Sequence, residues 1–68
     1  MKLYWPCGTR LTDDGRKEPV STYDATTSMG EARKQIELWK DWFHFNITEA
    51  HVDVYEKGTK LQTITIIK

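Results

Sequence analysis

The sequence predicts an α+β domain in which a single helix packs on one face of a small, mainly antiparallel sheet. Two observations support this fold class: an amphipathic helical pattern lies in the middle of the chain, and β-rich segments flank it on both sides. The expected order is β-(β)-α-β-β, with three to four strands. A length of 68 residues fits one such domain, 1–68, because two would each fall near the ~40-residue floor for unassisted folding.

The helix is expected from about Met29 to about Phe43. Ser28 and Glu31 have the spacing of a capping box, in which the serine side chain caps the first turn and the glutamate reaches back. Apolar side chains recur at spacings of 3, 4, 3 and 4 and form one stripe: Met29, Ala32, Ile36, Trp39 and Phe43. This stripe should face the sheet.

The segment before the helix predicts two strands joined by a polar turn. Residues 1–5 have the composition of a short strand that stops at Pro6, because proline cannot donate to a strand ladder. Residues 12–16 contain Gly15 among turn-forming side chains and suit a hairpin tip or a loop. Residues 20–25 are partly β-branched and give the second strand.

After the helix, residues 47–56 and 60–68 predict a hairpin with its turn at 56–59. If Gly58 forms a bulge, the register places the apolar residues of both strands on one face, and burial should select this register. The face toward the helix would then show Ala50, Val52, Val54, Ile64 and Ile66. The opposite, mixed face would show His51, Asp53, Tyr55, Leu61, Thr63, Thr65 and Ile67.

The last strand contains an uncharged run, 63–67, that would promote aggregation if it lay on an open sheet edge. We expect residues 1–5 to pair with it and make it an internal strand. The alternative is that it pairs with another molecule.

Charge and targeting signals restrict the function classes. Ten basic residues balance ten acidic ones, and neither half of the chain forms a basic arm, which argues against nucleic-acid binding. The first residues lack the apolar core of a signal peptide, and no stretch is long enough to span a bilayer. These features favour a cytoplasmic protein that does not associate with membranes.

Few residues suggest chemistry. Cys7, His44 and His51 are potential ligands or nucleophiles, but no close-spaced pair or catalytic motif accompanies them. The sequence therefore predicts no catalytic residue, no metal site and no cofactor. The secondary candidate surface is a row of strand residues at i, i+2 and i+4: His51, Asp53 and Tyr55.

A second apolar surface of the helix is the primary candidate for partner binding. Leu38, Trp42 and Phe45 lie away from the core stripe, and a single sheet covers only one side of a helix. Aromatic residues concentrate binding energy at interfaces. The alternative is that residues 9–23 fold over this surface from within the chain.

We therefore expect a small, non-catalytic protein-interaction module that binds an unknown protein partner or a second copy of itself. Its short chain of zero net charge would suit an accessory or inhibitor protein of a phage or mobile element. The alternatives are a ligand-binding or catalytic domain that uses the surface formed by His51, Asp53 and Tyr55, and a weak nucleic-acid-binding domain.

Overall fold

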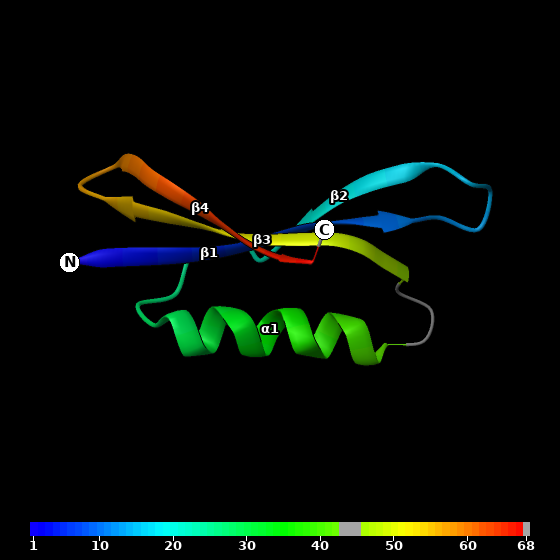
Figure 1. The fold of residues 1–68 in the computed structure, drawn as a ribbon, viewed down its shortest axis with the longest axis horizontal. Helices are drawn as coiled ribbons and strands as arrows, with labels where there is room; N and C mark the ends of the chain where they lie inside the picture. The colour runs from blue at the N-terminus through cyan, green and yellow to red at the C-terminus, as the bar shows by residue number, and fades with distance from the viewer. Residues whose placement is uncertain (43–45, 68) are drawn as a thin grey trace.

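The computed structural model of the chain describes residues 1–42 and 46–67. It confirms the predicted α+β fold, with one helix under one face of a four-stranded antiparallel sheet (Figure 1). The elements in chain order are β1 (Lys2–Leu11), β2 (Lys17–Ser21), α1 (Met29–Asp41), β3 (Asn46–Glu56) and β4 (Thr59–Ile67). The strand order is β2-β1-β3-β4, so two hairpins meet through their inner strands.

The helix α1 begins and packs as its sequence predicts. The side chain of Ser28 accepts a hydrogen bond from the backbone N–H of Glu31 at 3.4 Å. The core cluster comprises Ala32, Ile36, Trp39, Ala50 and Val52, with Met29 packed against it. The helix ends at Asp41 rather than near Phe43, which lies outside the described residues.

The prediction that the first strand stops at Pro6 is wrong. β1 continues through Pro6, because no described residue pairs with Pro6 on the β2 side of β1. Tyr4 exchanges backbone hydrogen bonds with Thr26 on the β2 side of β1, and Pro6, two residues on, presents its nitrogen to the same side. The β2 ladder begins only at Cys7, so the missing N–H of Pro6 has no ladder bond to break.

β2 lies earlier in the chain than the predicted 20–25. The turn at 12–16 closes the β1–β2 hairpin, so Leu11 pairs with Lys17 and the pairing ends at Ser21. Beyond it, the indole N–H of Trp5 donates to the carbonyl of Thr22 at 2.9 Å and holds the chain against β1 as it turns toward α1.

In the second hairpin, Val52 pairs with Ile64, as predicted, so these two apolar residues lie on the same face of the sheet. The predicted bulge at Gly58 is wrong. Lys57 and Gly58 form a two-residue turn with φ of 52° and 79°, as a type I′ turn requires. The register shifts instead between Val54 and Tyr55, and again between Ala50 and His51.

The second shift changes the side of the sheet on which the last residue of β4 lies. Ile67 pairs with Ala50 and packs against the core cluster, whereas the sequence placed it on the opposite face. Ile66 also packs against this cluster. The irregularity therefore allows two consecutive isoleucines to contact the core.

The expected pairing of residues 1–5 with the last strand is also wrong, because β1 pairs with β3 and β4 lies at an edge. Among the strands, the two inner ones supply the large side chains that are fully buried: Pro6 from β1, and Val52 and Val54 from β3. In β4, by contrast, Gln62 lies opposite Val54 and is exposed. Placing β1 and β3 at the centre therefore buries more apolar surface under α1.

Candidate functional site

The face of the sheet opposite α1 carries the candidate site, and within the described residues no other element covers it (Figure 1). Successive strand residues point to opposite faces, so the residues between the buried ones of β3 appear here. Cross-strand pairing then sets two rows side by side: Cys7, His51 and Thr65 form one, and Trp5, Asp53 and Thr63 form the other.

The carboxylate of Asp53 lies at the centre of the polar groups on this face. It is buried, with 9% of its surface exposed, although it is charged. The hydroxyl of Thr63 donates to Oδ1 at 2.8 Å, and Nζ of Lys60 lies 3.9 Å from the same oxygen. The other oxygen, Oδ2, lies 3.6 Å from Nε2 of His51 and 3.9 Å from Sγ of Cys7. The two carboxylate oxygens therefore have separate sets of neighbours.

Cys7 is held as a thiol in this environment. Burial raises the pKa of its thiol, and the negative charge and hydrogen-bond acceptor of Asp53 raise the pKa further, while Lys60 opposes them. The side chain of Cys7 also lies 3.6 Å from the carbonyl of Trp5. Because the thiolate is the reactive form, the free thiol is a poor nucleophile near neutral pH.

An aromatic pair borders the polar cluster. The rings of Trp5 and Tyr55 meet edge to face, with centroids 6.3 Å apart. Such contacts contribute about 0.5–1.5 kcal/mol beyond the area that they bury. The pair gives the open face an apolar rim next to Asp53, which pairs with Trp5 across the strands.

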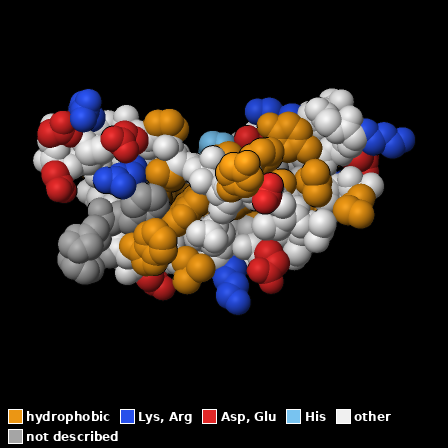
Figure 2. All heavy atoms as spheres, turned by 180° about the vertical axis from the view of Figure 1, so that it is seen from behind, with side chains coloured by type: hydrophobic (Ala, Val, Ile, Leu, Met, Phe, Trp, Pro, Cys, Tyr) orange, Lys and Arg blue, Asp and Glu red, His pale blue; other side chains and the backbone are white. Residues whose placement is uncertain are grey.

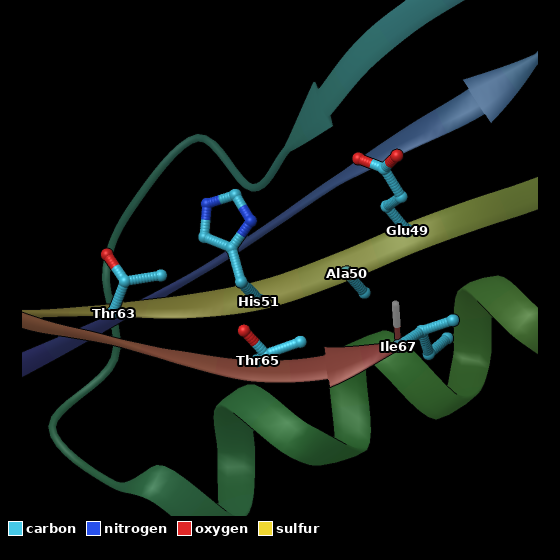
Figure 3. Close-up of a pocket in the computed structure, with 6 residues that line it drawn as sticks. All are labelled: Glu49, Ala50, His51, Thr63, Thr65 and Ile67. Atoms are coloured by element: carbon cyan, nitrogen blue, oxygen red, sulfur yellow. The ribbon is translucent and has the colours of Figure 1, made fainter.

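A pocket of about 310 Å³ adjoins the cluster near the end of β4. Figure 3 shows Glu49, His51 and Thr63 on the side of the strands away from α1. The lining residues are Glu49, Ala50, His51, Thr63, Thr65 and Ile67. His51 and Thr63 thus border the pocket and also contact Asp53.

The structure brings the secondary candidates together only in part. His51 and Asp53 are in contact, as their spacing along one strand suggests, while Tyr55 packs on Trp5 instead. Cys7 completes the cluster, although the sequence indicated no partner for it. Cys7 joins the cluster because the β1–β3 register sets it opposite His51. One signal for this contact was visible in the sequence: both side chains carry an atom that can bind a metal.

The primary candidate surface on the helix is exposed where the structure describes it. Leu38 is 45% exposed and Trp42 is 55% exposed, while Phe45 lies outside the described residues. Residues 9–23 were the alternative, a cover from within the chain, and most of them belong to the β1–β2 hairpin at the edge of the sheet. Within residues 1–42 and 46–67, the side chains of Leu38 and Trp42 are therefore partly exposed.

Charge is mixed over the surface that Figure 2 shows. Lys and Arg side chains lie among Asp and Glu side chains, and hydrophobic side chains gather between them. On this face, no broad patch of one charge is seen. This distribution agrees with the balanced composition of the sequence.

Comparison with known proteins returns no relative. No protein-family model matches the chain, and neither the curated proteins nor the solved structures contain a match. Over residues 1–42 and 46–67, no helix has both the length and the apolar character needed to cross a membrane.

Proposed function

We propose that the chain is a non-catalytic interaction module that pairs with a second copy of itself along the exposed edge of β4. One observation carries the proposal: the sheet formed by the described residues has two edges, and charge, proline and short length protect only the β2 edge. An edge strand presents unpaired N–H and C=O groups, so an unprotected edge is a ready site for strand addition.

The β2 edge has the features by which proteins prevent such pairing. It is only five residues long, Lys17–Ser21, and its exposed residues include two charged side chains followed by a proline. Charge, proline and short length are the usual protections of an edge strand. Addition of a strand at β2 is therefore disfavoured.

The β4 edge lacks these protections over most of its length. The strand has nine residues, and from Leu61 to Ile67 it contains no charge, proline or glycine. Leu61 is 50% exposed, and Ile64, Ile66 and Ile67 are only partly buried. Pairing along this edge would satisfy backbone groups and shield apolar side chains from water.

A second copy is the occupant that best fits this edge. About a two-fold axis at Ile64, antiparallel pairing sets Ile64 opposite its own counterpart and Thr63 opposite Thr65. The uncharged stretch then faces itself, so no like charges oppose one another within it. A chain of this size buries a modest share of its surface, and oligomerisation is a common source of added stability.

Size-exclusion chromatography with light scattering, over a series of protein concentrations, tests the proposal. We expect a dimer in the wild type and a shift toward monomer in Thr65→Lys. The two-fold axis creates two Thr63–Thr65 cross-strand pairs, and losing each costs up to about 1 kcal/mol, so dissociation should increase by about tenfold. The matched control is Ser21→Lys, which adds the same charge to an exposed position of the β2 edge.

Other outcomes contradict the proposal in distinct ways. A wild type that is monomeric at every concentration excludes self-pairing. A dimer that is unchanged in Thr65→Lys but lost in Trp42→Ala assigns the interface to the helix surface that contains Leu38 and Trp42.

A further inference from the structure

We propose that Cys7, His51 and Asp53 form a binding site for a divalent transition-metal ion of the zinc type on the open face of the sheet. The three side chains supply one sulfur, one nitrogen and one oxygen donor, and these atoms all lie within 4.8 Å of one another. They come from two adjacent strands, with Cys7 directly opposite His51 and Asp53 two residues further along β3.

The separations are close to those of a tetrahedral site. Zinc–ligand bonds of about 2.0–2.3 Å imply donor–donor distances of roughly 3.3–3.8 Å. Oδ2 of Asp53 lies 3.6 Å from Nε2 of His51 and 3.9 Å from Sγ of Cys7. Side-chain rotation alone can close the remaining gap between Cys7 and His51, because both project from the same face.

The hydrogen bonding of Asp53 fits a ligand role. Thr63 donates to Oδ1 at 2.8 Å, and Lys60 lies on the same side of the carboxylate. This contact fixes the carboxylate while Oδ2 faces the other two donors. Metal-binding carboxylates are commonly oriented in this way by a hydrogen bond to the oxygen that does not bind the ion.

The donor set selects the class of ion. Mixed thiolate, imidazole and carboxylate ligands suit zinc, whereas magnesium and calcium require oxygen donors. On binding, the thiol of Cys7 releases its proton to solvent and the sulfur bonds to the ion. Three protein ligands leave a fourth position for water. One of the three, His51, also borders the pocket of about 310 Å³.

Cobalt(II) is the probe for this site, because its complexes absorb visible light and a cobalt–thiolate bond adds a charge-transfer band. We expect titration of the reduced wild-type protein to produce both signals with one equivalent of cobalt, and zinc to displace them. The charge-transfer band should be absent in Cys7→Ser. Thr63→Val should weaken binding by about 10–100-fold, the usual effect of removing a hydrogen bond to a ligand.

Glu49→Gln is the matched control for Asp53→Asn, because Glu49 is an exposed carboxylate on the same strand that lines the neighbouring pocket but lies outside the cluster. We expect normal cobalt binding in Glu49→Gln and at least tenfold weaker binding in Asp53→Asn. Circular dichroism of each variant separates loss of the site from loss of the fold.

A measurement on the wild type alone avoids any folding defect in the variants. Zinc should slow alkylation of Cys7 by iodoacetamide, and a chelator should restore the rate. The proposal is overturned if cobalt gives no thiolate band, or if zinc leaves alkylation unchanged. Neither readout depends on self-association, so the site and the β4 edge are tested separately.

Discussion

The two faces of the sheet are built by alternate residues of the same strands, yet they differ in kind. On β3, Ala50, Val52 and Val54 are almost fully buried under α1. The residues that alternate with them on the same strand, His51, Asp53 and Tyr55, face the open side with β1 and β4 side chains around them. The face toward α1 is therefore determined by the burial of apolar side chains. The open face is determined by the strand register, which decides which polar groups lie side by side.

This difference explains which features of the sheet could be predicted from the sequence. Burial leaves a periodic apolar pattern that is visible in a single strand. A polar cluster such as Cys7 with His51 and Asp53 leaves no such pattern, because its members are brought together from distant parts of the chain.

The largest expected effect tests the contrast at neighbouring positions of β3. Val52→Asp places a charge in a fully buried site without a partner, so the free energy of unfolding should fall by more than about 4 kcal/mol. His51→Asn, one residue away on the open face, should change it by less than about 1 kcal/mol. Urea denaturation measures both values, and similar losses in the two variants would mean that the open face is also part of the core.

An intermediate effect compares two tryptophans of the helix region. Trp39 is 5% exposed, and its replacement by alanine should cost about 3–5 kcal/mol. Trp42 is 55% exposed, so Trp42→Ala should cost less than about 1 kcal/mol in the same urea experiment. A loss of several kcal/mol in Trp42→Ala would show that this side chain belongs to the core and is not available to a partner.

The smallest expected effect concerns thiol reactivity on the open face. The pKa of Cys7 is raised by burial and by Asp53, so its alkylation should be slow below the raised pKa and increase with pH. Asp53→Asn removes the negative charge, lowers the pKa of Cys7 and should speed alkylation at pH 8 by roughly 3–10-fold.

The alkylation rates are measured with a chelator present, so that bound metal does not mask the thiol. Glu49→Gln should behave as the wild type, because Glu49 is not among the groups that shift the pKa of Cys7. Equal rates in the wild type and Asp53→Asn would contradict the assigned role of Asp53.

The helix and its packing were predictable because their determinants are local. The cap at Ser28 and the spacing of Ala32, Ile36 and Trp39 lie within one segment, and the structure confirms them. The bounds of the strands were harder to predict from the sequence. The course of β1 through Pro6 depends on a gap in the pairing between β2 and the Tyr4–Thr26 bridge, which only the folded chain defines.

The candidate site was predictable only where it follows a single strand. The contact between His51 and Asp53 follows from alternation along β3, but the place of Cys7 depends on the β1–β3 register. The edge position of β4 was also missed, since the strands can be ordered in several ways and the total burial under α1 decides between them.

The alternation of the two faces has a consequence for the energetics of ligand binding. Each of the three cluster residues lies between two buried neighbours: Cys7 between Pro6 and Gly8, His51 between Ala50 and Val52, and Asp53 between Val52 and Val54. The core therefore holds the backbone beneath every donor atom before a ligand arrives. Preorganisation of this kind confines the entropic cost of binding to the rotation of a few side chains.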